Sequence, residues 1–172
     1  MKVVIVNGQG RSGKDTFCDL CGYFTNVHKY SSVDEIKRMA RLAGWDGKTK
    51  DEKTRKFLSD LKFLCSEYSD MPMRLMKEKF NSLNGIYEGE KEQILFLMSR
   101  ECEEIYRAKQ ELNAITLLIR NPNIAKIFSN SADANVEEYQ DKYGYDSIIN
   151  NDGTLDDLKA KASEFVYKII GG

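Results

Sequence analysis

The sequence predicts an α/β fold, a doubly wound sheet of five parallel strands that carries a helical insert. The first observation is the regular return of short apolar runs along the 172 residues, with amphipathic helical patterns between them. The second is that several runs are continuously apolar, which is typical of strands buried on both faces of a parallel sheet. The expected strands are residues 2–7, 27–31, 93–98, 114–119 and 147–150.

Helical periodicity fills the intervals between these strands. A first helix is expected over residues 13–25, with Phe17, Leu20, Cys21 and Phe24 on one apolar face. Later helices are expected over residues 102–110, 135–140 and 155–169, with Thr154 as the N-cap of the last.

Residues 32–84 are predicted to form an all-helical insert between the second and third strands. Ser32 is expected to open its first helix in a capping box with Glu35, and further helices are expected over residues 51–69 and 73–83. The long helix is expected to turn inward a stripe of Phe57, Leu58, Leu61, Leu64, Cys65 and Tyr68. One helix is enough to join two parallel strands, so three in succession suggest a cap over the functional site.

Composition excludes several classes of partner. A net charge of −1 gives no long-range field for nucleic acid or for a membrane surface, and neither is expected as a partner. The chain enters a strand at Lys2 without the layout of a signal peptide, and no apolar run is long enough to span a bilayer. Four cysteines lack zinc-site spacing, and Cys18 and Cys21, although spaced as a redox pair, are expected to be reduced and buried. We therefore expect a cytoplasmic protein with a single domain over residues 1–172.

A glycine-rich loop follows the first strand. Its sequence, Gly8-Gln9-Gly10-Arg11-Ser12-Gly13-Lys14-Asp15-Thr16, matches the phosphate-binding pattern G-x-x-x-x-G-K-[ST] in every position but the last. Glycines let backbone N–H groups turn inward around a phosphate, and the following helix directs its positive end at the same anion. The lysine adds a mobile charge for the outer phosphates. Nucleotide phosphates are therefore expected to bind to Gly8, Gly10, Ser12, Gly13, Lys14, Asp15 and Thr16, directly or through a metal ion.

Three arginines are expected close to this loop. Arg100 and Arg120 each follow a central strand, and ligands of doubly wound sheets bind outside the carboxyl ends of the strands. Arg11 lies within the loop itself. Cations placed between two polyanions favour phosphoryl transfer, in which catalysis is chiefly positioning and charge neutralisation. The predicted catalytic residues are therefore Lys14, Arg11, Arg100 and Arg120.

Asp15 stands where Ser or Thr normally offers a hydroxyl to Mg²⁺. A carboxylate can hold Mg²⁺ through a retained water, so Asp15 is predicted to be the metal ligand, with the Thr16 hydroxyl nearby. The alternative is a simple charge interaction with the helix dipole. No aspartate ends the third strand, where a second metal carboxylate is often found, and Asp15, Glu101 or Asp34 is expected to share that task.

Residues 9–16, with their Ser-Gly-Lys-Asp core, resemble the loop of phage-type deoxynucleoside monophosphate kinases and of animal-type phosphomevalonate kinases. Both groups share the nucleoside monophosphate kinase-like P-loop NTPase fold. The resemblance implies that the insert binds the acceptor, that residues 121–135 form a short lid, and that the turn containing Asn151 lies beside the adenine. The residues that would bind the acceptor are Asp34, Arg38, Arg55 and Arg100, although an exposed helix face is an equal explanation for Arg38 and Arg55.

The expected activity is ATP-dependent transfer of the γ-phosphoryl group to a small phosphorylated acceptor, with Mg²⁺ as cofactor. A (deoxy)nucleoside monophosphate is the favoured acceptor, and its phosphate, being ionised already, needs no strong base. A second hypothesis assigns a non-nucleotide phosphate or a hydroxyl acceptor, as in phosphomevalonate or dephospho-coenzyme A kinases; a hydroxyl would require a base such as Asp34 or Glu101. A third hypothesis is a nucleotide-binding module without catalysis.

Overall fold

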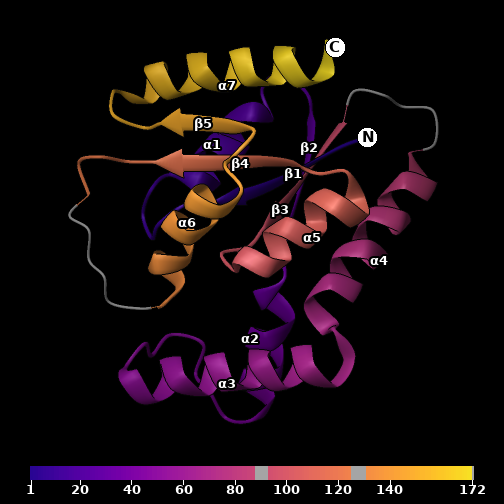
Figure 1. The fold of residues 1–172 in the computed structure, drawn as a ribbon, viewed down its shortest axis with the longest axis vertical. Coiled ribbons are helices and arrows are strands. Elements are labelled where there is room, and N and C mark those ends of the chain that lie inside the picture. Colours follow the sequence, from indigo (N-terminus) through magenta and orange to yellow (C-terminus); the bar gives the residue numbers. More distant parts are fainter. Residues whose placement is uncertain (88–92, 125–130, 172) are drawn as a thin grey trace.

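A computed structural model describes residues 1–87, 93–124 and 131–171, with the backbone alone for 131–135 and 137. Within these residues five strands form one sheet in the order β2-β3-β1-β4-β5, and every neighbouring pair is parallel (Figure 1). The predicted doubly wound α/β fold is therefore confirmed. The strands are β1 (Lys2–Asn7), β2 (Asn26–Ser31), β3 (Gln93–Met98), β4 (Ile115–Arg120) and β5 (Ser147–Asn150).

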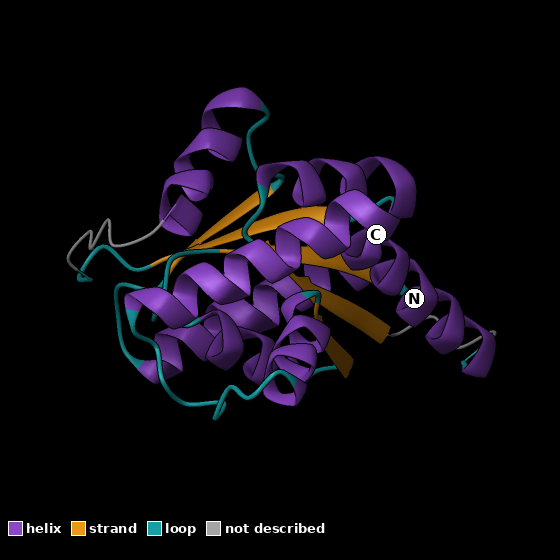
Figure 2. Ribbon diagram, turned by 90° about the horizontal axis from the view of Figure 1, so that it is seen from below, coloured by secondary structure: helices purple, strands orange, loops and turns teal. Residues whose placement is uncertain are grey.

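Helices cover both faces of the sheet, which lies between them in Figure 2. One face packs against α1 (Lys14–Cys21) and α7 (Leu155–Ile170). The other packs against α4 (Met71–Ile86), α5 (Cys102–Leu112) and α6 (Ser131–Lys142). Strands buried on both faces explain why β1, β3 and β4 are continuously apolar in the sequence.

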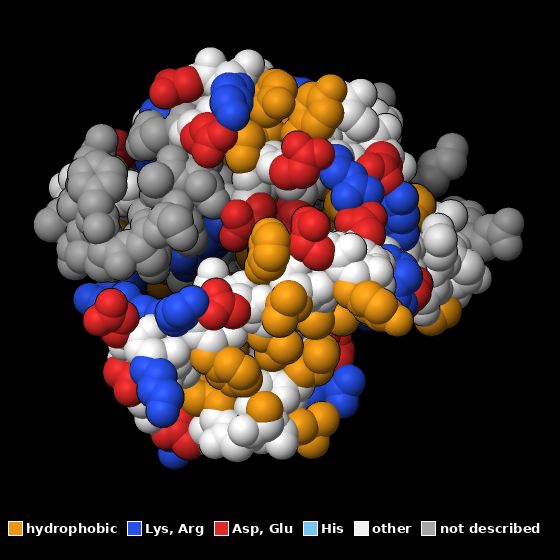
Figure 3. Space-filling model, turned by 60° about the horizontal axis from the view of Figure 1, so that its bottom comes forward, with side chains coloured by type: hydrophobic (Ala, Val, Ile, Leu, Met, Phe, Trp, Pro, Cys, Tyr) orange, Lys and Arg blue, Asp and Glu red, His pale blue; other side chains and the backbone are white. Residues whose placement is uncertain are grey.

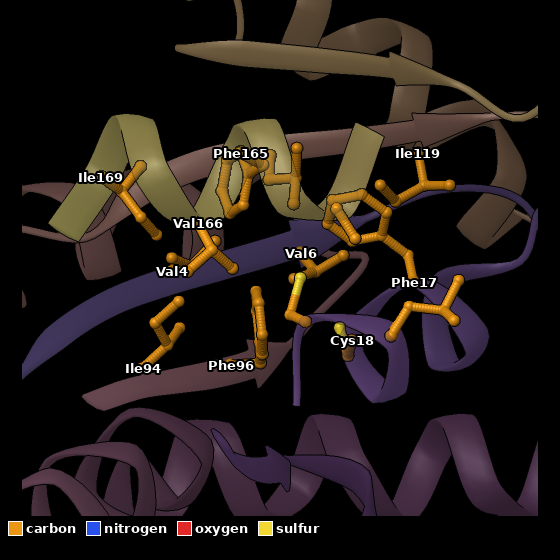
Figure 4. Close-up of a cluster of buried hydrophobic side chains, with 14 of the residues drawn as sticks. Val4, Val6, Phe17, Cys18, Ile94, Phe96, Ile119, Phe165, Val166 and Ile169 are labelled. Carbon is orange, nitrogen blue, oxygen red and sulfur yellow. The ribbon is translucent and has the colours of Figure 1, made fainter. Parts of the chain in front are cut away.

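The core beneath α1 and α7 holds the helix that follows the phosphate loop. Val4 and Val6 point from β1 towards this side, where Phe17 and Phe165 meet edge to face with ring centroids 5.6 Å apart (Figure 4). Phe17 is fully buried. The start of α1 is thus fixed by apolar packing directly behind the loop.

Strand register brings three chain segments together at the carboxyl edge of the sheet. Val6 lies opposite Met98 of β3 and Leu117 of β4, and the N–H of Ser99 donates to the Val6 carbonyl over 3.3 Å. The segments that follow β1, β3 and β4 therefore begin side by side.

The insert contains three helices, which is the number predicted: α2 (Val33–Leu42), α3 (Glu52–Ser69) and α4. The predicted inward stripe of α3 is wrong, because α3 has no buried residue. Leu64 is 62% exposed and Tyr68 is 93% exposed. The apolar periodicity is real and α2 packs against α3, but Leu58, Leu61 and Cys65 of the stripe are only half-buried. Figure 3 shows hydrophobic side chains gathered at this end of the molecule.

Two local predictions for the beginning of the chain are also wrong. The first helix ends at Cys21 rather than at residue 25, since the chain turns at Gly22 and leaves Phe24 partly exposed. The capping box of Ser32 and Glu35 does not form. Ser32 instead donates its hydroxyl hydrogen to Glu104, over 3.2 Å, and Glu35 pairs with Arg38.

Helices α4 and α6 begin earlier than the sequence pattern predicts. Helix α4 begins at Met71, because a proline in the first turn of a helix removes no intrahelical hydrogen bond. Helix α6 extends from Ser131 to Lys142 rather than from 135 to 140. Much of the predicted lid at 121–135 lies outside the described residues.

Candidate functional site

The phosphate loop joins β1 to α1, and two of its glycines, Gly8 and Gly13, are required by geometry. Gly8 has φ +151°, and a Cβ there would lie 2.4 Å from the carbonyl oxygen of Ile119. Gly13 has φ +93°, and its Cβ would lie 2.4 Å from Asn151 Nδ2. A Cβ on Gly10 would meet nothing within 4 Å, so at that position the backbone is open to the approach of a ligand. The loop therefore has the close packing behind and the open front that phosphate binding requires.

Lys14 lies across this loop. Its Nζ donates to the carbonyl oxygens of Gly8 and Gln9, each over 2.9 Å. The first helical hydrogen bond of α1 runs from Phe17 N to Gly13 O, which leaves the N–H groups of the first turn directed at the loop. An ammonium group and a helix N-terminus thus face the same small volume, and both attract an anion.

Two asparagines hold the loop from behind, Asn7 and Asn151, and sequence analysis did not identify Asn7. Asn7, which is fully buried, accepts from the Gly8 N–H over 2.7 Å and donates to Tyr145 Oη over 2.7 Å. Asn151 donates from Nδ2 to the Ser12 carbonyl over 3.1 Å and from its backbone N–H to the Arg120 carbonyl over 2.6 Å. The turn after β5 is therefore tied both to the loop and to the end of β4.

A cavity of about 430 Å³ opens beside the loop. It is lined by the loop, the end of β4 and the facing side of α6 and β5: Gln9, Ser12, Leu118, Ile119, Arg120, Asn121, Pro122, Ile124, Val136 and Asn150. Ser12 is buried, and its Oγ has no hydrogen-bond partner among the described residues. An unsatisfied buried hydroxyl on the wall of a cavity is costly unless a ligand or a water satisfies it.

The three predicted arginines take different places. Arg120 lines the cavity beside the loop, as expected from its position after β4. Arg100 is half-buried immediately after β3, next to Ser99, but it is not among the residues that line this cavity. Arg11 is exposed within the loop and has φ +65°, a left-handed conformation that is uncommon for a residue with a side chain.

Asp15 and Thr16 are exposed in the first turn of α1, at the mouth of the loop. Among the described residues no group of three or more His, Cys, Asp or Glu side chains could hold a metal ion. This donor set fits Mg²⁺ held by one carboxylate, by a nearby hydroxyl and by substrate phosphates, because Mg²⁺ is usually bound in that way. The role of Asp15 as a metal ligand stays a prediction.

The acceptor residues predicted on the insert are exposed and engaged locally. Asp34 pairs with Lys37 over 3.1 Å, Arg38 pairs with Glu35 over 2.6 Å, and Arg55 Nε donates to the Lys50 carbonyl over 2.9 Å. These contacts are short-range and weak in solvent, so the side chains can exchange them for a ligand at little cost.

A buried carboxylate that sequence analysis did not identify lies where β2 and β3 end. Glu104 Oε2 accepts from the hydroxyls of Ser32 and Ser99, and its Oε1 lies 2.7 Å from Lys62 Nζ. The side chains of Lys62 and Glu104 are only 15% and 12% exposed. Glu104 precedes Ile105 and lies four residues before Ala108, both of which are buried, and this spacing could have indicated an inward position.

A second cavity, of about 410 Å³, separates α3 from α5. Its walls are residues of α3, the corner between α3 and α4, and the start of α5: Ser59, Lys62, Phe63, Ser66, Glu67, Asp70, Pro72, Met73, Glu101, Glu103, Glu104 and Arg107. At the far end Arg107 donates to both carboxylate oxygens of Asp70 over 2.7 Å, and these hydrogen bonds lower the pKa of Asp70.

The cysteines are not part of the phosphate loop or of either cavity lining. All four are free thiols, and Cys18 and Cys21 are buried in α1. Burial raises the pKa of both, that of Cys21 to about 12, so both remain protonated at neutral pH. The prediction that this pair is buried is thus confirmed.

No helix in the described part of the chain is both long and apolar enough to cross a membrane. No model of a known protein family matches the sequence, and no curated protein matches it. Among solved structures, the chain is similar to the dephospho-CoA kinase of Campylobacter jejuni, with a TM-score of 0.57 and 17% sequence identity. The similarity covers 100% of this chain and 99% of the other. The five-stranded parallel sheet and its helices therefore share the fold of that kinase.

Proposed function

We propose that this protein is an ATP-dependent kinase of a small acceptor, with a (deoxy)nucleoside monophosphate as the favoured substrate. The observation that carries the proposal is the loop itself. Lys14 lies across it, bonded to the carbonyl oxygens of Gly8 and Gln9, and Gln9 and Ser12 of the loop line a cavity whose wall includes Arg120. A phosphate chain held by the loop extends towards this arginine, so cations lie at both ends of the transferred group. The kinase fold supports the same reading.

In the proposed reaction an acceptor oxygen attacks the γ-phosphorus of ATP. The bond between the γ-phosphorus and the β–γ bridging oxygen breaks, and ADP leaves with that electron pair. Lys14 stabilises negative charge on the outer phosphates, and Arg120, Arg100 and Arg11 neutralise the group in transfer. Asp15 and Thr16 would hold Mg²⁺, which when bound would supply further neutralisation of the phosphates.

The helical insert would receive the acceptor. Asp34, Arg38 and Arg55 lie on its exposed faces, and closure of the insert would exclude water from the transferred group. If the acceptor presents a phosphate, its oxygen is already ionised and no protein base is needed. The cationic character of the site agrees with this. The two carboxylates considered as bases are each paired with a lysine, Asp34 with Lys37 and Glu101 with Lys62.

The decisive experiment is an ADP-release assay across a panel of acceptors with purified protein, ATP and Mg²⁺. We expect turnover with one or more nucleoside monophosphates, and a loss of about 10²-fold or more in the Lys14→Ala variant, since the lysine stabilises charge in the transition state. Lys168→Ala, which removes an exposed lysine of α7, is the matched control and should keep wild-type turnover. Turnover in Lys14→Ala at the wild-type rate would rule the proposal out.

A dephospho-coenzyme A-type acceptor is the second candidate, and the observation that favours it is the dephospho-CoA kinase among similar structures. A hydroxyl acceptor must lose a proton, so an essential carboxylate is expected in that case. Dephospho-coenzyme A and phosphomevalonate therefore belong in the panel, with Asp34→Asn and Glu101→Gln as variants. A large fall in kcat in either variant, with a hydroxyl acceptor only, would assign the base. Tight ATP binding without ADP release for any acceptor would instead support a non-catalytic nucleotide-binding module.

A further inference from the structure

Helix α3 is attached to the rest of the protein in an unusual way. It has no buried residue, and a cavity separates it from α5. Ion pairs span this cavity at two places, Lys62 with Glu104 near the strand ends and Asp70 with Arg107 at the corner that leads to α4. Helix α3 packs on α2 and α4, and these directional ion pairs add a direct constraint on where α3 lies relative to α5.

The two ion pairs differ in burial. The side chain of Asp70 is 51% exposed, whereas both partners of the other pair are almost withdrawn from water. Glu104 is also joined to the residues after two strands, because Ser32 follows β2 and Ser99 follows β3, and both donate to the same oxygen. Ser99 is in turn bonded through its N–H to Val6, the residue before Asn7 at the start of the loop.

We propose that Glu104 is a positioning residue, which fixes helix α3 of the insert relative to the carboxyl edge of the sheet. Both of its oxygens are occupied, one by two hydroxyls and the other by an ammonium, so it is not placed to act as a base. Its effect on catalysis passes through Lys62 and the two serines. The link to acceptor binding rests on the proposed function, in which the insert receives the acceptor.

The burial of the pair determines what its removal should do. A charge left without its partner in a buried place is strongly destabilising, whereas removal of both charges is often tolerated. Glu104→Gln keeps a carbonyl oxygen for the serines but leaves the buried Lys62 ammonium with only the longer contact to Glu101, over 3.4 Å. Lys62→Met leaves a lone carboxylate with two hydroxyl donors. The double variant K62M/E104Q leaves neither charge and should fold even if a single variant does not.

The consequence for the kinase reaction is specific. Loss of the pair should release α3 without moving the phosphate loop, which is held by Asn7, Asn151 and the core behind α1. The KM for the acceptor should therefore rise by about tenfold or more, as expected for loss of a buried charge pair, with the dissociation constant of ATP unchanged.

The experiment measures three quantities in Glu104→Gln, Lys62→Met and K62M/E104Q: hydrogen exchange of backbone amides over residues 52–69, the dissociation constant of ATP, and the acceptor KM. Lys56→Met is the matched control, because Lys56 pairs with Asp60 on the exposed surface of the same helix and, among the described residues, forms no ion pair with another element. We expect faster exchange over α3 and a raised acceptor KM in every variant of the buried pair, and neither change in the control.

Each outcome has a separate meaning. Unchanged α3 exchange in the double variant would overturn the proposal, and so would ATP binding and acceptor KM that weaken together, since that pattern indicates general loss of structure. If the wild-type protein turns over no acceptor, the proposed function fails, and the exchange data alone decide the role of Glu104.

Discussion

The phosphate loop and helix α3 are held in place by different interactions. The loop is fixed by backbone geometry and by buried groups behind it: glycines that only fit without a Cβ, a buried asparagine and the apolar core under α1. Helix α3 has an amphipathic sequence, yet it buries no residue and is joined to α5 by ion pairs across a cavity. In the proposed kinase reaction the loop would position one substrate rigidly and the insert would close adjustably over the other, and these two tasks call for different physical means.

Truncation of apolar side chains gives the largest expected contrast between the two regions. Phe17→Ala, behind the loop, should lower the free energy of unfolding by about 3–5 kcal/mol, because it empties a fully buried position. Leu64→Ala on α3 should lower it by less than about 0.5 kcal/mol, since that side chain is exposed. Urea unfolding followed by circular dichroism measures both. Equal losses would mean that α3 is covered in solution, and the comparison would no longer hold.

Glycine substitution tests the geometry of the loop, with a smaller expected loss of stability. Gly8→Ala should destabilise the protein by about 1–3 kcal/mol, since its Cβ would lie against the Ile119 carbonyl at a φ that disfavours side chains. It should also weaken ATP binding, which titration calorimetry would measure. Gly10→Ala is the matched control for stability, because a Cβ there meets no atom within 4 Å. A Gly8→Ala protein as stable as the Gly10→Ala protein would contradict the described loop conformation.

The smallest effect is expected from the exposed ion pair of α3. Hydrogen bonds from Arg107 lower the pKa of Asp70, so the folded state binds its proton less tightly than the unfolded state does. The pair therefore stabilises the protein above the ordinary aspartate pKa of about 3.9, and its contribution is lost as pH falls below that value. Asp70→Asn should cost less than about 1 kcal/mol at pH 7, after allowance for solvent screening.

Melting temperatures recorded from pH 7 to pH 3 would test this prediction. The difference between wild type and Asp70→Asn should be constant at neutral pH and should narrow only in the most acidic samples. A difference that persists unchanged at pH 3 would show that the asparagine acts through packing rather than through charge.

Sequence reasoning succeeded where a residue pattern has only one physical explanation. The continuous apolar runs of β1, β3 and β4 require burial on both faces, and the loop residues from Gly8 to Lys14 require a tight strand-to-helix turn. It failed for α3, because periodicity at Leu64 and Tyr68 defines a face without showing that anything covers it. The number of strands and helices could thus be predicted, but the surroundings of α3 could not.

The polar residues of the site show the same limit. Ser32 and Glu35 have the spacing of a capping box, yet Ser32 bonds to Glu104, which is 72 positions away in the sequence. Asn7 and Glu104 each act through partners that strand order brings near, and no local pattern records those partners. Lys62 similarly resembles any other lysine of a charged helix until α5 is placed beside it.

The distribution of cysteines has a practical consequence for spectroscopy. Two cysteines are partly exposed: Cys65 lies on α3, within the insert, and Cys102 lies on α5, outside it. Cys18 and Cys21 are buried in the core. Thiol-directed spin labels or fluorophores should therefore attach at two native positions without any engineered cysteine. The separation of such labels, followed while nucleotide and acceptor are added, would record the movement of the insert directly.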